Sequence, residues 1–321
     1  MISSRRCIPL CSLLVFIACA LPIGEGCNSS SGASSSSSLP VFSIYWSVAV
    51  GDLNGDGRAD IVASYTLAES QTSQPGFVAV YLQDPSNPGT FSRATYSVDN
   101  NPESVAVGDL NGDGRLDIVT ANTTISSSVG APNSVSVLLH DPTKPGQFLP
   151  ATSYHAGDAP ISVAVGDLNG DGKSDLAVAD SSGISILLQN PNMPGAFLPR
   201  TAPGIGSWAS SVAIADINGD NKADLIATAA ASVVVLLQNP AVPGTFSPPT
   251  NYGVGLQPIY AVVSDLNGDG KPDLAVANLG SPSDGTTSSV SVLPPESGCF
   301  RCLSDGDELQ GRFSLQRRGD C

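Results

Sequence analysis

The stretch DLNGDGRAD, residues 52–60, decides the fold of this chain, because close copies of it recur along the sequence. The copies are DLNGDGRLD at 109–117, DLNGDGKSD at 167–175, DINGDNKAD at 216–224 and DLNGDGKPD at 265–273. Their first aspartates stand 49 to 58 residues apart. A period of this length corresponds to one supersecondary unit per copy. The sequence therefore predicts five repeats.

Short apolar runs flank every acidic stretch. In the first repeat SVAV at 47–50 precedes it, DIVAS at 60–64 follows it, and FVAVYL at 77–82 forms a third run. A proline-glycine turn such as QNPAVPGTF at 238–246 and a weaker fourth segment such as SPPTNYGVG at 247–255 complete the repeat. Four short runs separated by turn residues predict four antiparallel strands. The fold class we expect is all-β, a β-propeller of about five four-stranded blades.

The composition fits this interpretation and limits the partners. The chain of 321 residues has 33 glycines, 25 prolines and a formal net charge of −15. Nucleic acids and anionic membranes require a basic surface, so neither is an expected partner. Three aspartates in each of the five acidic stretches are enough to account for the negative charge. Bound cations would relieve the repulsion among them.

The acidic stretches have the residue types and spacing of a calcium site. Aspartate at positions 1, 5 and 9 and asparagine at position 3 present oxygen ligands, and the residue at position 7 can add its backbone carbonyl. Glycine at position 6 permits the positive φ of a tight turn. Up to five Ca²⁺ ions are therefore expected. The predicted ligands are Asp52, Asn54, Asp56, Arg58 and Asp60; Asp109, Asn111, Asp113, Arg115 and Asp117; Asp167, Asn169, Asp171, Lys173 and Asp175; Asp216, Asn218, Asp220, Lys222 and Asp224; Asp265, Asn267, Asp269, Lys271 and Asp273.

Two alternatives to a β-hairpin calcium loop fit these stretches less well. An EF-hand needs glutamate at position 12, where this chain has alanine, threonine or valine, and it needs flanking helices. Ordinary Asx-Gly hairpin turns explain a single copy, but five copies that keep all three aspartates favour a ligand role. Asn221 replaces glycine at position 6 of the fourth stretch. Asparagine also tolerates positive φ, so this site is expected to be weakened but not lost.

These residues resemble the FG-GAP/VCBS repeats of integrin-α-like β-propellers, in which DxNGDGxxD hairpins bind Ca²⁺. The resemblance covers roughly residues 41–293 and is specific, because the period, the flanking strands and the ligand types agree. It implies a propeller with calcium in the hairpin between the first and second strands of each blade. It does not imply the function of integrins. The family mostly builds about seven blades, whereas only five acidic stretches occur here.

The closure of the ring is a separate expectation. After the third strand of the fifth repeat, the sequence departs from the turn and fourth strand of the other repeats. We therefore expect LPVFSIYW, residues 39–46, to complete the fifth blade and close the ring, with the propeller spanning 39–293 and an irregular tail over 294–321. A truncated ring, or a ring closed by dimerisation, stays open as an alternative.

The N-terminus reads as an export signal over residues 1–20. Arg5 and Arg6 precede an apolar run from Ile8 to Leu21 that is too short for a membrane span, and Ala18 to Ala20 fits a cleavage site. A Ser-rich linker follows over 21–38. The expected location is secreted or cell-surface, and a lipoprotein tether through Cys19 or Cys27 stays open.

The other cysteines do not form a framework for the repeats, which contain none. Cys299, Cys302 and Cys321 lie in the tail, where a disulfide or an irregular segment is favoured over half of a zinc site.

Binding is favoured over catalysis. The only histidines are His140, which holds a turn position that is glutamine elsewhere, and His155 in a weak fourth segment. No catalytic residue is therefore predicted. The expected role is a binding or cell-adhesion module for an extracellular glycan or protein; a structural scaffold, or the propeller of a carbohydrate-active enzyme, is the alternative. Candidate ligand contacts are aromatic residues expected on the rim away from the acidic loops, with filling of gaps between blades as the other interpretation: Tyr45, Trp46, Trp208 and Tyr260.

Three repeats also carry an insertion. Repeats one, two and five are longer than three and four between the second and third strands, at residues 67–76, 122–133 and 278–288. These polar segments are expected on the rim opposite the acidic loops, where recognition loops commonly lie.

Overall fold

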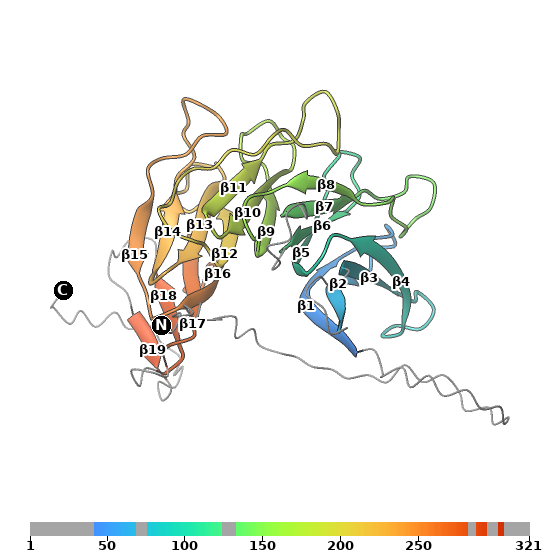
Figure 1. The fold of residues 1–321 in the computed structure, drawn as a ribbon, viewed down its shortest axis with the longest axis horizontal. Coiled ribbons are helices and arrows are strands. Elements are labelled where there is room, and N and C mark those ends of the chain that lie inside the picture. The colour runs from blue at the N-terminus through green and yellow to red at the C-terminus, as the bar shows by residue number, and fades with distance from the viewer. Residues whose placement is uncertain (1–41, 69–75, 124–132, 282–286, 294–300, 305–321) are drawn as a thin grey trace, which may run out of the picture.

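A computed structural model of the chain describes residues 42–68, 76–123, 133–281, 287–293 and 301–304. All regular elements in these ranges are strands, and they form five antiparallel sheets (Figure 1). The signal, the linker and Cys299 and Cys321 lie outside the described residues. No described segment forms a helix with the length and apolar character of a membrane span.

The strands follow one another along the chain and each sheet is built from consecutive strands. Sheet one contains β1 (Phe42–Gly51), β2 (Asp60–Ala68), β3 (Gly76–Gln83) and β4 (Phe91–Val98); sheet two contains β5 (Pro102–Gly108), β6 (Asp117–Asn122), β7 (Ser134–Leu138) and β8 (Thr152–His155); sheet three contains β9 (Ser162–Gly166), β10 (Asp175–Asp180) and β11 (Gly183–Leu187); sheet four contains β12 (Ser211–Ala215), β13 (Asp224–Ala229), β14 (Ser232–Leu236) and β15 (Thr250–Gly253); sheet five contains β16 (Pro258–Ser264), β17 (Asp273–Asn278), β18 (Ser289–Leu293) and β19 (Arg301–Ser304).

Sheet three has no fourth named strand among the described residues. Its outer edge is a single bridge between Ile186 and Thr201. The other four sheets have the expected four strands.

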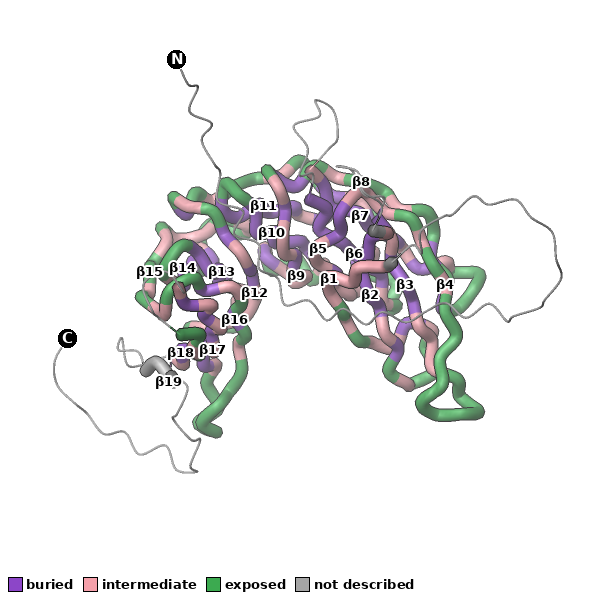
Figure 2. The backbone as a smooth tube through the Cα atoms, turned by 60° about the horizontal axis from the view of Figure 1, so that its bottom comes forward, coloured by how far each residue is buried: buried purple, intermediate pink, exposed green. Residues whose placement is uncertain are grey.

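The sheets pack face to face in chain order. The first strand of each sheet lies beside the first strand of the next, β1 with β5, β5 with β9, β9 with β12 and β12 with β16. Apolar side chains fill each space between sheets, as where Ile184 of sheet three packs with Val212 and Leu225 of sheet four. Figure 2 shows that the five sheets form an open arc, with sheets one and five at its two ends. The structure therefore supports propeller-like packing of sheets but shows no closed ring.

The prediction that residues 39–46 complete the fifth blade is wrong for the part that the structure describes. β1 pairs with β2 along its whole length, from Phe42 opposite Ala68 to Gly51 opposite Asp60. A shift of register at Trp46 inserts one extra residue, which lets the strand continue past the bulge. The fourth strand of sheet five is instead β19, paired with β18. β19 lies in the segment that was expected to be an irregular tail.

The inserted segments lie where the sequence placed them. Residues 181–182 join β10 to β11 and residues 230–231 join β13 to β14, whereas longer segments join β2 to β3, β6 to β7 and β17 to β18. Most of these longer segments fall outside the described residues. In a closed ring these three segments would form one continuous wall, but the described residues show no closed ring.

Candidate metal centre

Each acidic stretch forms the loop between the first and second strands of its sheet. In the first loop the Asp52 carboxylate accepts three backbone N–H groups, from Gly55 at 2.8 Å, Asp56 at 3.1 Å and Gly57 at 2.8 Å. The corresponding three bonds occur in all five loops, with first aspartates Asp109, Asp167, Asp216 and Asp265. The aspartate at position 1 therefore holds the turn through its own side chain.

The residue at position 6 needs a positive φ. Gly57 has a φ of 80°, and Asn221, which replaces glycine in the fourth loop, has a φ of 61°. The N–H of Asn221 still donates to Asp216 at 2.7 Å. Asn221 thus adopts the positive φ that was expected of it, and the weakening of the fourth metal site stays a prediction.

Positions 3 and 5 continue the same pattern. The Asn54 side-chain oxygen accepts the N–H of Asp56 at 2.9 Å, and the Asp56 carboxylate accepts the N–H of Arg58 at 2.9 Å. The other four loops repeat both bonds. The aspartates at position 5 are exposed, along the rim of the arc that carries the acidic loops.

The aspartate at position 9 differs because it is buried. Asp117 accepts the N–H of Leu110 at 2.8 Å within its loop and the N–H of His140 at 2.7 Å beyond the end of the third strand. Asp60, Asp175 and Asp224 bridge the same two positions in their own sheets. In the first four loops, position 9 therefore joins the loop to the core of its sheet.

Burial changes the acidity of these carboxyls. Loss of water raises the pKa of Asp117 and of Asp175 to about 6, and the two accepted backbone N–H bonds oppose the shift in each case. The pKa of Asp224 is raised for the same reason. Neighbouring carboxylates at positions 1 and 5 add to the rise. A cation at the loop would favour the ionised form.

In the fifth loop the same aspartate is held differently. Asp273 accepts the N–H of Leu266 at 2.9 Å and lies 3.4 Å from the side-chain nitrogen of Asn267. In the sequence, the residue two positions after the third strand is His140 in the second repeat and residue 295 in the fifth, and residue 295 lies outside the described residues. Residue 295 is proline in the sequence and has no N–H to donate.

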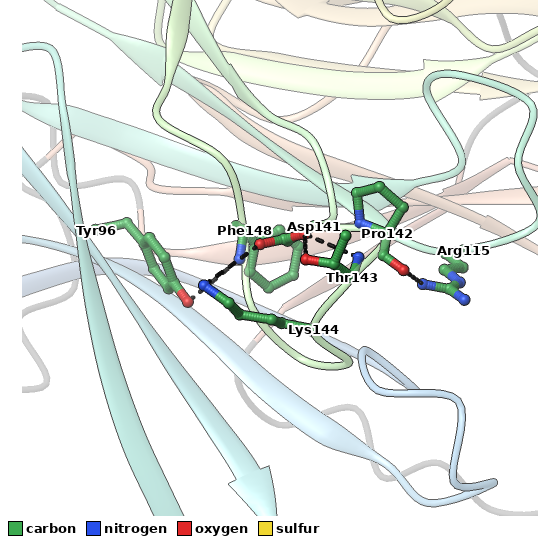
Figure 3. Close-up of polar contacts among 7 residues, drawn as sticks. All are labelled: Tyr96, Arg115, Asp141, Pro142, Thr143, Lys144 and Phe148. Atoms are coloured by element: carbon green, nitrogen blue, oxygen red, sulfur yellow. Dashed lines mark hydrogen bonds and ion pairs between the residues drawn. The ribbon is translucent and has the colours of Figure 1, made fainter.

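In the second and third loops, the basic residue at position 7 contacts the turn that follows the third strand instead of the carboxylates of its own loop. Arg115 approaches the ring of His140 at 3.3 Å, and Lys173 reaches the carbonyl of Pro191 at 3.4 Å. Arg115 also approaches the carbonyl of Pro142 at 3.5 Å (Figure 3). Among the described residues, the carboxylates of the first four loops form no ion pair with a lysine or arginine. The negative charge of these loops is thus available to an added cation.

The donor set of the loops fits Ca²⁺, since every side-chain donor is an oxygen and position 7 can add a carbonyl. In the described part of the chain no three acidic, histidine or cysteine side chains converge on one point, and the loop carboxylates face their own backbone N–H groups instead. Each carboxylate oxygen has two acceptor sites, so these bonds leave capacity for a metal ion.

The predicted aromatic contacts lie away from the acidic loops but are not gathered in one site. Tyr45 and Trp46 belong to β1 and Tyr260 to β16, so only Trp208 lies in a link between strands. Trp46 donates its indole N–H to Thr66 at 3.2 Å. Trp208 is 47% exposed and Tyr260 is 57% exposed.

Tyr45 belongs to an aromatic cluster that the sequence analysis missed. Its hydroxyl lies 3.1 Å from that of Tyr81, and its ring is 5.2 Å from that of Tyr65. Burial raises the pKa of Tyr45 to about 12. The Arg93 guanidinium lies over both Tyr65 and Tyr81. The register of β2 with β3 puts the rings of Tyr65 and Tyr81 on one face of the sheet, and this pairing is the signal that could have revealed the cluster.

Tyr260 also lines the central cavity. This cavity has a volume of about 390 Å³ and its wall is formed by first strands of all five sheets, with serine hydroxyls from Ser47, Ser104 and Ser162. A second hollow, of about 650 Å³, lies between the third and fourth acidic loops.

The two histidines occupy the places expected of them. His140 is buried in the turn at the position of Gln189 and Gln238, and accepts the Gly146 N–H at 3.1 Å. His155 is exposed on β8, with its ring 3.1 Å from the Asn133 carbonyl.

Comparison with known proteins agrees with this geometry. The FG-GAP-like repeat pattern matches residues 67–120, 126–178 and 167–227, and the FG-GAP repeat pattern matches residues 45–81 and 261–293. The chain belongs to the FG-GAP repeat family. No curated protein matches the chain.

Solved structures of similar fold are larger. The rhamnogalacturonan lyase YesW is 15% identical with a TM-score of 0.52, and the match covers 85% of this chain and 53% of that one. The exotype rhamnogalacturonan lyase YesX is 18% identical with a TM-score of 0.50, covering 84% of this chain and 50% of that one. The Bacillus licheniformis rhamnogalacturonan lyase is 16% identical with a TM-score of 0.50, covering 81% and 50%. The chain thus spans about half the length of these structures, and the likeness concerns the fold alone.

Proposed function

We propose that this chain is an exported, calcium-stabilised binding module that captures an extracellular glycan or protein. The observation that supports it best is the repetition of one oxygen-rich loop five times, with the same backbone bonds and without basic partners for the carboxylates of the first four loops. A loop that served only as a turn would not need three carboxylates in each copy.

Calcium would supply positive charge to each loop. Positions 1, 3, 5 and 9 would hold it with side-chain oxygens and position 7 with its carbonyl. In the second loop these ligands would be Asp109, Asn111, Asp113, Asp117 and Arg115. Asp117 would carry the effect of binding into the sheet, because it already joins the loop to the end of the third strand. The loops would thereby become rigid supports for the rest of the molecule.

The ligand would bind on the rim of the arc opposite the acidic loops. Tyr260 and Trp208 expose large aromatic surfaces there, and aromatic rings with a polar group are well suited to sugar and protein contacts. The export signal expected from the sequence and the membership of the FG-GAP family both favour an extracellular ligand. We propose no catalytic role, since His140 is held in a turn and His155 is bonded to a backbone carbonyl.

The second candidate is a scaffold, or the propeller of a larger carbohydrate-active enzyme. It is favoured by one observation, the similarity of fold to rhamnogalacturonan lyases about twice as long as this chain. Isothermal titration with CaCl₂ followed by glycan-array screening of the calcium-loaded protein tests the proposal. Calcium uptake with ligand capture supports it, calcium uptake without any capture favours the scaffold, and absence of calcium uptake refutes the calcium part.

A further inference from the structure

Neighbouring sheets are joined at their acidic-loop end by a repeated contact, which we call the loop latch. One half is the apolar residue at position 2 of an acidic loop, and the other half is the turn of the next sheet with its glutamine or histidine and its phenylalanine. Leu110 is fully buried and shares a core with Phe197, while the Gln189 side chain donates to the Leu110 carbonyl. Leu168, Phe246 and Gln238 repeat the arrangement between sheets three and four.

The latch between sheets one and two has the same parts. Leu53 of the first loop shares a core with Phe148 of the second turn. His140 replaces glutamine there, and the Phe148 N–H donates to the hydroxyl of Tyr96 at 3.3 Å (Figure 3). The turn glycine Gly146 lies against the side chain of Asn54 in the loop below. At each of these three junctions within the described residues, one sheet therefore offers the loop and the next offers the turn.

The two ends of the arc each keep one half of this latch without a partner among the described residues. Sheet one offers the turn half: Phe91 is 40% exposed, whereas Phe148 and Phe197 are each 7% exposed, and nothing lies within 4 Å of the position that a Cβ on Gly89 would take. Sheet five offers the loop half: Leu266 is 41% exposed, whereas Leu110 is fully buried.

The strand faces below the latch follow the same rule. Val105, Val163 and Val212 hold one position in the first strands of sheets two, three and four, and each is 6% exposed because the preceding sheet covers it. Val48 holds this position in sheet one and is 67% exposed. On sheet five, the face that would cover the next sheet carries Val290, which is 43% exposed.

We propose that the two ends of the arc bind each other between copies of this chain, with sheet five of one copy packed on sheet one of the next. The two faces are complementary because they are the two halves of an interface whose latch forms three times among the described residues, between sheets one and two, two and three, and three and four. Within one copy they are held apart: the interfaces between sheets are close-packed, which fixes the step from sheet to sheet, and the arc stays open (Figure 2).

Such a contact is heterologous, because each copy uses a different surface on its two sides. Heterologous contacts build closed rings or open filaments, in contrast to the self-limited dimers of two-fold interfaces. In each contact Leu266 of one copy then meets Phe91 of the next, so all copies point in the same direction along the assembly.

The test is light scattering of the full chain after size-exclusion chromatography over a hundredfold range of concentration. The unaltered protein is expected to show masses that rise as multiples of one chain. Phe91→Asp and Leu266→Asp are each expected to run as single chains, because each loses one side of the contact. Mixed in equal amounts, they are expected to form a complex of two chains, since each retains the side that the other lacks.

Controls separate assembly from folding. Val242→Asp changes an exposed apolar residue in the turn of sheet four, away from both end faces, and should assemble like the unaltered protein. If circular dichroism shows that a latch variant fails to fold, the mixing experiment is repeated with Val48→Asp and Val290→Asp. Each of these variants alters the exposed strand face at one end of the arc. A single-chain mass for the unaltered protein at every concentration overturns the proposal, and so does failure of the paired variants to complement each other. Neither result depends on whether the module captures a ligand.

Discussion

The Asp175 carboxylate accepts the backbone N–H of Gln189 at 2.7 Å with one oxygen, and with the other it accepts the N–H of Leu168 at 2.9 Å. This side chain is fully buried, so its two bonds connect an acidic loop to the third strand inside the sheet. The loop is thus part of the folded core even before a metal ion is considered.

This relationship predicts a calcium-independent loss of stability in Asp175→Ala. The substitution leaves two buried N–H groups without a partner, each of which costs about 1–3 kcal/mol. We expect the free energy of unfolding in urea with EGTA to fall by about 2–4 kcal/mol. Asp171→Ala is the matched control, because Asp171 is exposed and should lose little stability in EGTA. Equal losses for both variants would contradict the structural role of position 9.

Calcium is expected to raise the melting temperature strongly. For an extracellular-type dissociation constant of ~0.1 mM, 1 mM free Ca²⁺ would stabilise the folded state by roughly 1.4 kcal/mol per site. Five independent sites would add up to about 7 kcal/mol, which is comparable with the stability of a whole domain. Scanning calorimetry in EGTA and then in CaCl₂ measures this difference. MgCl₂ at the same ionic strength is the control for screening, and superimposed melting curves would show that the loops hold no calcium.

The fourth loop gives a smaller, local prediction. Asn221 has a φ of 61°, a region that costs asparagine little, glycine less and alanine roughly 1 kcal/mol. Asn221→Ala is therefore expected to lower the free energy of unfolding by about 1 kcal/mol in EGTA, and Asn221→Gly to leave it within about 0.5 kcal/mol. With calcium, Asn221→Gly should bind at least as tightly as the unaltered protein. A more stable alanine variant would show that this backbone conformation is wrong.

The sequence predicted the loops and strands well because their determinants are local. The DxNGDGxxD spacing specifies its own turn, as the bonds of Asp52 to Gly55 and Gly57 show. Closure of the ring depends on pairing between segments far apart in the sequence. In the structure β1, with its bulge at Trp46, pairs with β2 of its own sheet instead. Val48 and Val105 have equivalent places in their repeats, yet one is exposed and the other buried. The sequence pattern of a repeat does not show whether another sheet covers its first strand.

The carboxyl of Glu103 is expected to make the free energy of unfolding fall as the pH rises. Burial raises the pKa of this carboxyl from 4.5 to about 7, so the folded state holds its proton more tightly than the unfolded state. The contribution is fully present below pH 4.5 and is lost as the pH approaches 7. Glu103→Gln keeps the neutral form at every pH and should gain on the order of 2 kcal/mol relative to the unaltered protein between pH 5 and pH 8. Urea unfolding at both pH values, in EGTA, measures the difference; a constant offset between the two proteins would contradict it.

Exposed aromatic rings give the last prediction, which concerns ligand capture. Trp208 and Tyr260 lie on the rim of the arc away from the acidic loops, and about half of the surface of each side chain is exposed to water. If they contact a sugar ring or a protein side chain, Trp208→Ala and Tyr260→Ala should each weaken capture about tenfold or more while leaving the melting temperature in calcium nearly unchanged. Trp46→Ala is the matched control: Trp46 is partly buried and bonded to Thr66, so its loss should lower stability instead. Capture is measured by surface plasmon resonance on the ligand selected from the array. Undiminished capture in the double variant of Trp208 and Tyr260, with folding intact, would place the ligand site elsewhere on the molecule.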